Sequence, residues 1–217
     1  MAGEGYPPRR EGMRRTAAAL AAAQVPFALA GGYAAWVRGA PEPEHDVDFT
    51  ILEADVERAK EAVAGAGLTV EQPVEDWLFK AFYEGAMVDV LFRMCGETVT
   101  PALLARSDPI QVLGVTMPVM RATEILTAKI QVLTEHHCNF ATLLPVARAL
   151  REQVDWEYVR AETAGNPFSE AFVFLLDRLA IVPLGGPAER APGTGDGAAD
   201  GLGDGATPAT GDGAGTT

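Results

Sequence analysis

Residues 27–38 read Phe27-Ala-Leu-Ala-Gly-Gly-Tyr-Ala-Ala-Trp-Val-Arg38, which predicts a short apolar strand, two glycines at its end and then a helix. Because glycine carries no Cβ, the backbone at Gly31 and Gly32 can come close to a ligand. The helix N-terminus that follows offers unpaired N–H groups and the positive end of the helix dipole, which suit a phosphate group. The segment therefore predicts a phosphate-binding turn.

A second strand is expected at residues 46–52, in the segment that begins Glu44-His-Asp-Val-Asp-Phe-Thr-Ile51, and it carries Asp46 and Asp48. Side chains two residues apart on a strand point to the same face, so the two carboxylates lie together. Like charges placed this way repel each other unless a cation lies between them. Two carboxylates beside a phosphate-binding turn supply the oxygen ligands that a Mg²⁺-dependent phosphate enzyme needs.

A third aspartate, Asp89, lies in the apolar run Ala86-Met-Val-Asp-Val-Leu-Phe92, which predicts another strand. An unpaired carboxylate among such neighbours is costly to bury. The residues alone leave two interpretations open. Asp89 either forms a hydrogen bond or salt bridge within the fold, or it joins Asp46 and Asp48 in one site.

These three features, in this order, resemble the DNA polymerase β-like nucleotidyltransferase superfamily. The likeness covers roughly residues 20 to 150 and is greatest to small nucleotidyltransferases: aminoglycoside and lincosamide adenylyltransferases, and abortive-infection type toxins. It implies that Asp46, Asp48 and Asp89 are catalytic and bind Mg²⁺ at the phosphates of an NTP. For Asp89 the resemblance allows two roles, third metal ligand or general base at the acceptor hydroxyl.

The resemblance also assigns residues to the nucleotide. Gly31, Gly32 and the backbone amide of Tyr33 would hold the triphosphate. Lys129, on an otherwise apolar helix face, matches a lysine that faces the nucleotide in related small nucleotidyltransferases; from the residues alone, extension to solvent is an equal alternative. Arg38 and Lys80 are further basic candidates, and for both the sequence favours a surface position.

The loop before the aspartate pair departs from the family pattern. It brings Glu42, Glu44 and His45 where relatives often have Arg, Lys, Ser or Thr. This extra negative charge would either weaken nucleotide binding or receive a cationic acceptor. The segment Glu135-His-His-Cys-Asn139 contains metal-binding residue types, but contiguous side chains on a helix diverge and cannot converge on one ion. A helix junction is the better interpretation than a zinc site.

The composition limits the classes of partner and the compartment. The 217 residues carry a net charge of −13, which disfavours nucleic acid and membrane surfaces and suits a cationic small molecule. The two cysteines do not make a disulfide framework, and no apolar run is long enough to cross a membrane. An export signal around the N-terminal arginines is disfavoured, because cleavage after Ala30 would remove the first strand. We therefore expect a cytoplasmic protein.

The sequence predicts an α/β fold with a mixed sheet, in three parts. Residues 1–118 form the nucleotidyltransferase core, residues 119–184 a helical C-terminal region, and residues 185–217 a disordered tail rich in Gly, Ala, Asp, Thr and Pro. Helices are expected at 9–24, 33–38, 54–66, 122–135 and in three later segments up to Leu179. Strands are expected at 27–30, 46–52, 68–71, 77–83, 86–93 and 110–117.

The expected reaction is Mg²⁺-dependent transfer of a nucleoside monophosphate from an NTP, ATP among them, to a hydroxyl. The favoured acceptor is a small, aminoglycoside-like molecule, and the alternative is tRNA or protein, as for a toxin. Two rivals stay open. A glycosyltransferase also uses Asp-x-Asp, but it needs a longer α/β domain than the 45 residues that precede Asp46 here. A non-catalytic descendant of the fold would bind nucleotides or regulate a partner without turnover.

Overall fold

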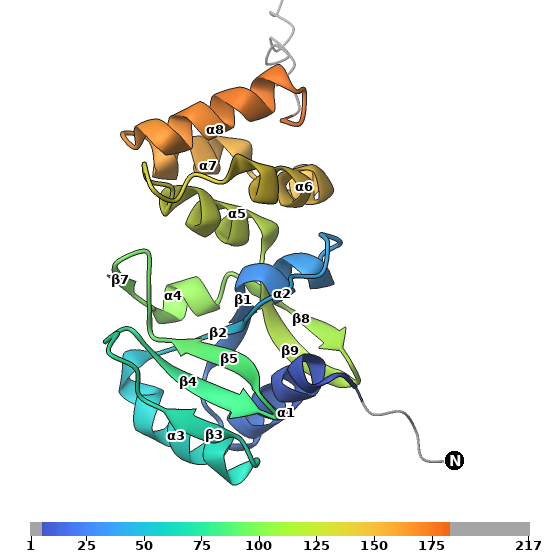
Figure 1. Cartoon of the computed structure of the whole chain (residues 1–217), viewed down its shortest axis with the longest axis vertical. Coiled ribbons are helices and arrows are strands. Elements are labelled where there is room, and N and C mark those ends of the chain that lie inside the picture. The colour runs from blue at the N-terminus through green and yellow to red at the C-terminus, as the bar shows by residue number, and fades with distance from the viewer. Residues whose placement is uncertain (1–5, 183–217) are drawn as a thin grey trace, which may run out of the picture. The chain divides into compact units, whose positions relative to one another are not determined.

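Seven strands form one mixed sheet within residues 6–182, the part of the chain that this computed structural model describes (Figure 1). They are β1 (Phe27–Ala30), β2 (Val47–Ile51), β3 (Thr69–Glu71), β4 (Leu78–Tyr83), β5 (Ala86–Leu91), β8 (Ser107–Val112) and β9 (Val115–Met120). Their order across the sheet is β3-β4-β5-β2-β1-β9-β8. The predicted α/β fold with a mixed sheet is confirmed; the tail predicted at 185–217 lies outside the described residues.

The middle of the sheet carries two of the three aspartates. β1 pairs with β2 in antiparallel orientation, and β2 pairs with β5 in parallel orientation. All four residues of β1 are buried, as expected for a strand covered on both faces. The register places Ala30 opposite Asp48, and Asp48 opposite Asp89. Because residues opposite each other in neighbouring strands project to the same side, the carboxylates of Asp48 and Asp89 share one face.

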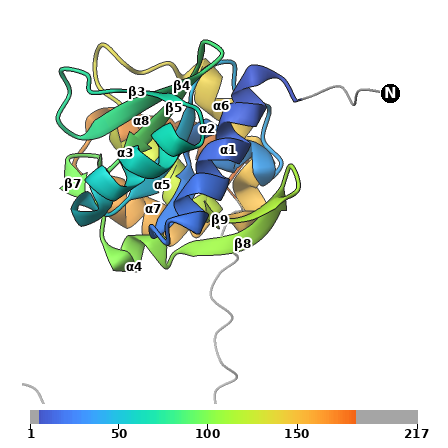
Figure 2. The ribbon, with the colours of Figure 1, turned by 90° about the horizontal axis from the view of Figure 1, so that it is seen from below.

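Two helices cover the other side of the central strands. They are α1 (Pro8–Ala22) and α3 (Val56–Gly65), which pack against each other and against the sheet (Figure 2). Met13, Ala17 and Leu20 of α1 are fully buried and recur at helical spacing, which forms the apolar stripe that the sequence predicts. Both predicted helices are therefore confirmed, with ends shifted by one or two residues.

The elements around the end of β1 are short. The helix α2 (Gly31–Val37) begins at the first of the paired glycines, earlier than the predicted start at Tyr33. The remaining short elements are the 3₁₀ turn η1 (Glu53–Asp55), the hairpin of β6 (Arg93–Met94) and β7 (Glu97–Thr98), the helix α4 (Pro101–Leu104) and the 3₁₀ turn η2 (Arg151–Gln153). Thr100 caps α4, accepting a hydrogen bond from the Leu103 amide at 3.2 Å.

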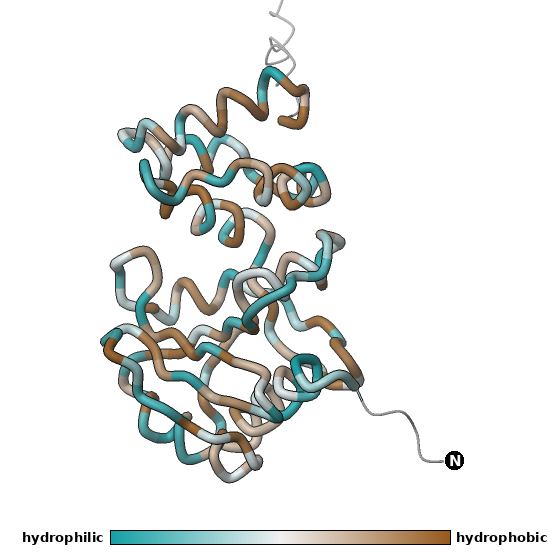
Figure 3. The backbone as a smooth tube through the Cα atoms, viewed as in Figure 1, coloured by the Kyte–Doolittle hydropathy of each residue, from teal (hydrophilic) through white to brown (hydrophobic). Residues whose placement is uncertain are grey.

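The last third of the described chain is helical, as predicted. It consists of α5 (Ala122–Gln131), α6 (Phe140–Leu150), α7 (Trp156–Thr163) and α8 (Pro167–Arg178). Asp155 caps α7 by accepting a hydrogen bond from the Tyr158 amide at 3.0 Å. Asn166 caps α8 by accepting from the Phe168 amide at 3.0 Å, with proline in the first turn. The hydropathy colouring shows apolar residues along the strands and along α8 (Figure 3).

Two predicted elements were wrong. The single strand expected at 110–117 is two strands, β8 and β9, joined at Leu113-Gly114. Both joining residues have positive φ, 49° and 82°, which is the geometry of a tight hairpin turn rather than of a bulge. The helix expected at 122–135 ends at Gln131 and is followed by a loop.

The boundary placed after residue 118 stays a prediction. Among the described residues, no helix is long and apolar enough to cross a membrane. Cys95 and Cys138 are both free and exposed.

Candidate functional site

Gly31 lies directly against the carboxylate of Asp48. It follows β1, whose last residue pairs with Asp48 in the register of the sheet. A Cβ added at Gly31 would lie 1.8 Å from Oδ2 of Asp48, and the φ of Gly31 is +59°, which side-chain-bearing residues rarely adopt. Glycine is therefore required here by both the close approach and the backbone conformation.

The first turn of α2 faces the same carboxylate. The backbone amide of Gly32 donates a hydrogen bond to Asp48. A Cβ at Gly32 would lie 2.9 Å from Cβ of Pro43, in the loop that precedes β2, so this glycine is also closely packed. The Tyr33 side chain is fully buried, and its hydroxyl lies 3.3 Å from Oε1 of Glu42. The turn thus packs against β2 and the loop that precedes it.

Negative charge concentrates around Asp48. Burial is the main cause that raises the pKa of Asp48 to about 6, and the charges of Asp89 and Asp46 contribute to this rise. The positive charge of Lys129 and the Gly32 amide act in the opposite direction. Burial also raises the pKa of Asp89, and Asp46 contributes to that rise. The three predicted aspartates are therefore close enough to influence one another, although Asp46 lies just before β2 rather than within it.

The structure gives Asp89 a partner that the sequence analysis did not expect. Nζ of Lys80 lies 3.1 Å from Oδ1 and 3.4 Å from Oδ2 of Asp89. The side chains of Lys80 and Asp89 are 24% and 10% exposed, so the ion pair is largely buried. The predicted surface position of Lys80 was wrong. The hairpin turn at Glu84-Gly85 could have revealed it, because counting back from that turn pairs Lys80 with Asp89.

Arg38 was also wrongly expected at the surface. Its guanidinium donates at 2.8 Å to both the Val119 carbonyl oxygen and Oδ2 of Asp108, and it also donates to the Met120 carbonyl oxygen. Its side chain is only 10% exposed. Arg38 therefore connects the end of α2 to β8 and β9, and it is a structural residue.

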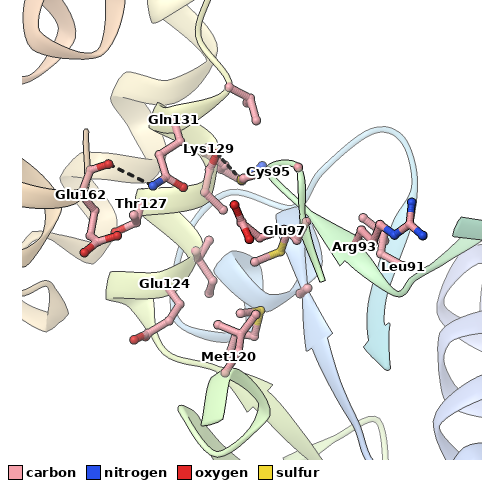
Figure 4. A pocket seen from close by; sticks show the side chains of 18 of the residues that line it. Leu91, Arg93, Cys95, Glu97, Met120, Glu124, Thr127, Lys129, Gln131 and Glu162 are labelled. Atoms are coloured by element: carbon pink, nitrogen blue, oxygen red, sulfur yellow. Dashed lines mark hydrogen bonds between the residues drawn. The ribbon is translucent and has the colours of Figure 1, made fainter. Parts of the chain in front are cut away.

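A cavity of about 1230 Å³ opens beside Asp48 and Gly31 and extends along α5 and α7. Lys129 of α5 lines the same cavity, and its positive charge acts on Asp48; its contact with the nucleotide stays a prediction. Figure 4 shows Lys129 and Cys95 close together, with Glu124, Thr127 and Glu162 toward α7. The Cys95 thiol lies 3.7 Å from the Ala128 carbonyl oxygen.

The lining of the cavity is acidic. Its charged side chains are the acids Asp48, Asp76, Glu97, Glu124 and Glu162, and the bases Arg93 and Lys129. The sequence analysis did not identify Glu124, whose side chain is 8% exposed. Oε2 of this residue and Oγ1 of Thr127 are buried without a hydrogen-bond partner, while Oε1 lies 3.3 Å from Arg106. No sequence pattern distinguishes Glu124 from other helical glutamates.

The acidic loop before β2 affects the site less than the sequence suggests. Glu42 forms a bidentate ion pair with Arg10 of α1, and this pair holds the pKa of Glu42 below its usual value. His45 is exposed. Residues 135–139 are exposed as well and lie in the loop between α5 and α6. Within residues 6–182, no group of three His, Cys, Asp or Glu side chains could hold a metal ion.

No protein-family model and no curated protein sequence matches the chain. Solved structures do. The solution structure of the antibiotic-resistance factor ANT(2'')-Ia matches with a TM-score of 0.54 and 14% identity, covering 78% of this chain and 96% of that protein. The crystal structure of ANT(2'')-Ia in complex with adenylyl-2''-tobramycin gives a TM-score of 0.44 and 15% identity, covering 79% and 98%. The chain therefore has the fold of a nucleotidyltransferase, as the glycine pair and the aspartates predict.

Proposed function

We propose that the chain is a nucleotidyltransferase that moves a nucleoside monophosphate from an NTP to a hydroxyl of a small molecule and releases pyrophosphate. The observation that carries this proposal is the meeting of Asp48, Lys129 and the glycine turn at one end of a single cavity. The fold shared with ANT(2'')-Ia supports it.

In this proposal the triphosphate lies between the turn and α5. The amides of Gly31, Gly32 and Tyr33 donate to phosphate oxygens, and Lys129 supplies a positive charge from the opposite wall. The absence of a Cβ at Gly31 and Gly32 lets the turn pack against Asp48 and Pro43. The triphosphate would take the Gly32 amide from Asp48, since that amide now donates to the carboxylate.

A divalent ion fits two of the three predicted ligands. Burial is the main cause of the raised pKa of Asp48, and the charges of Asp89 and Asp46 add to it. A cation would relieve this repulsion, and we propose Asp46 and Asp48 as ligands of Mg²⁺. Both oxygens of Asp89 already face Lys80, so Asp89 does not fit the ligand set as it stands. When bound, the ion would neutralise negative charge on the phosphates.

The proposed acceptor is a cationic small molecule. Five acids and two bases line the cavity, and the bases Lys129 and Arg93 are outnumbered even before the triphosphate adds its own charge. The cavity of about 1230 Å³ exceeds the range of about 300 to 1,000 Å³ typical of single small ligands, so it has room for a nucleotide and an acceptor together. The net charge of −13 disfavours the alternative acceptor, tRNA.

The test is label transfer from ATP, GTP, CTP or UTP, each labelled at the α-phosphate, to a panel of hydroxyl-bearing amines and amino sugars in the presence of Mg²⁺. We expect transfer by the unmodified protein, and a loss of at least about a thousandfold in Asp48→Asn. Asp177→Asn on α8 is the matched control and should retain full transfer. If the unmodified protein transfers no more label than Asp48→Asn, the enzymatic proposal is wrong.

A second candidate is a nucleotide-binding protein without turnover. It is favoured by one observation: the residues that the structure describes contain no group of three metal-ligating side chains. Calorimetry with each NTP distinguishes the two proposals when it is combined with the transfer assay. Nucleotide binding without any transfer across the whole acceptor panel supports this second candidate.

A further inference from the structure

Lys80 is fixed opposite Asp89 by the backbone, not by a choice of side-chain conformation. The turn between β4 and β5 has positive φ at Glu84 and Gly85, 47° and 80°, which is the geometry of a two-residue hairpin. Such a turn sets the register of the hairpin, in which Tyr83 pairs with Ala86 and Lys80 with Asp89. The most local pairing in the sheet therefore places Lys80 directly across from Asp89, where its ammonium group can reach the carboxylate.

The ammonium group engages both oxygens that a metal would need. Nζ of Lys80 lies 3.1 Å from one and 3.4 Å from the other, and it also lies 3.4 Å from Sδ of Met87. The negative charges that act on Asp89 include those of Asp46 and Glu75, and the repulsion between Asp48 and Asp89 acts on both carboxylates. Lys80 thus already provides, inside the carboxylate cluster, a positive charge that is covalently part of the chain.

A second metal ion at Asp89 would compete with this lysine. A divalent cation that shared the Asp89 carboxylate with Lys80 would place like charges within a few ångströms of each other in a largely buried setting, where repulsion is weakly screened. An ion held by Asp46 and Asp48 shares no carboxylate with Lys80; the positive charge that acts on Asp48 comes from Lys129, which forms no ion pair with Asp48 among the described residues. The two candidate positions for a cation are therefore unequal.

We propose that Lys80 takes the place of one divalent ion at Asp89, so that the centre holds a single divalent ion through Asp46 and Asp48. Lys80 is then a positioning residue that holds Asp89 and neutralises it. This inference rests on the proposed function, because it assumes that a nucleotide and a divalent ion bind at this site.

The test counts metal ions on the full chain with Mn²⁺ as the probe. The protein is saturated in turn with α,β-methylene analogues of ATP, GTP, CTP and UTP, and bound Mn²⁺ per bound nucleotide is measured by electron paramagnetic resonance of the free ion. We expect one Mn²⁺ in the unmodified protein and two in Lys80→Met, because removal of the ammonium frees Asp89. Lys60→Met is the matched control: the Lys60 side chain is also 24% exposed and ion-paired, with Glu57, and this variant should keep one.

Two further variants keep the test decisive if Lys80→Met fails to fold. Lys80→Arg retains the charge and should keep one ion. In an otherwise unmodified chain, Asp89→Asn should change Mn²⁺ affinity by less than about threefold, whereas Asp48→Asn should lower it at least about tenfold.

Two results would overturn the inference: two ions in the unmodified protein, or one ion in a folded Lys80→Met. Both leave the proposed function standing, because nucleotide is bound in both. Failure of every analogue to bind contradicts the proposed function itself, and the inference with it.

Discussion

At the scale of single residues, Gly31 is the described glycine whose replacement by any other residue is most strongly disfavoured. Its φ of +59° and the 1.8 Å approach of a Cβ to Asp48 act together, so no other residue fits without moving either the turn or the aspartate. The constraint joins the predicted phosphate turn to the predicted metal ligand. A change at one therefore displaces the other.

Replacement of Gly31 by alanine should lower both stability and nucleotide binding. We expect Gly31→Ala to lose about 1–3 kcal/mol in the free energy of unfolding, from the positive φ and the clash with Asp48. We expect at least about a tenfold loss of NTP affinity, because Asp48 must shift. Urea unfolding and calorimetry measure the two effects.

Gly65→Ala is the control for this substitution. Gly65 ends α3, has no positive φ, and its added Cβ would meet nothing within 4 Å. Its NTP affinity should equal that of the unmodified protein. Equal effects of the two substitutions would contradict the special role of Gly31.

At the scale of elements, the sequence predicts the core better than the connections. The strand at 27–30 and the capped helices at Asp155 and Asn166 follow from local composition, because apolar runs and capping residues act over a few positions. The β8–β9 hairpin does not, because Leu113 adopts positive φ although leucine rarely does.

The sequence predicts the aspartates of the site but not the residues that contact them. Strand alternation and register place Asp48 and Asp89 on one face, while Asp46 lies just before β2. The Lys80–Asp89 pair needed the register of a hairpin, and the cavity needed the position of α5 and α7 relative to the sheet. These long-range contacts leave no periodic signal in the sequence.

Ionisation of Glu11 in α1 should make the free energy of unfolding depend on pH. Bidentate contact with Arg14, together with Arg15, lowers the pKa of Glu11 to about 2, and the Glu11 side chain is 15% exposed. Because the folded pKa lies below the unfolded value near 4.5, this stabilisation is present in full above about pH 4.5 and is lost as the pH falls toward 2.

Glu11→Gln should therefore cost about 1–2 kcal/mol at pH 7 and progressively less below about pH 4.5. Urea unfolding at a series of pH values measures the difference. Glu57→Gln in α3, whose side chain is 82% exposed, should have no measurable effect at any of them. A difference in the free energy of unfolding between Glu11→Gln and the unmodified protein that stays constant down to pH 3 would contradict this assignment.

Asn166 should matter more than an ordinary helix cap. Its Oδ1 caps α8, while its Nδ2 donates to the carbonyl oxygens of Gln131 and Leu133 at 3.2 Å and 2.9 Å. One side chain thus closes the end of α5 and begins α8. We expect Asn166→Ala to cost about 2–3 kcal/mol in the free energy of unfolding, against about 1 kcal/mol for Asp155→Ala, which removes only a cap. Denaturant unfolding of both variants tests this order.

At the scale of the whole molecule, charge is the dominant property. The chain carries −13 overall, and the cavity lining adds acids near the proposed acceptor position. A cationic acceptor would be drawn toward such a surface, and dissolved salt would weaken that attraction. The proposed acceptor class therefore predicts that acceptor binding weakens as the ionic strength rises.

The KM for a polycationic acceptor should rise several-fold between about 0.05 M and 0.5 M salt. The KM for an uncharged hydroxyl acceptor should change much less over the same range, because it has no charge to screen. Steady-state label transfer at fixed Mg²⁺ and NTP measures both. An equal salt response for the two acceptors would contradict electrostatic selection of the acceptor.

The two free cysteines are natural attachment points for a reporter group. Cys95 borders the cavity, while Cys138 lies in the exposed loop between α5 and α6. A fluorophore attached to Cys95 in a Cys138→Ser background would stand at the mouth of the cavity, where an arriving molecule alters its surroundings. A fluorophore attached to Cys138 in a Cys95→Ser background would not respond to that binding. Fluorescence would then report whether the cavity is occupied, before any reaction product has been identified.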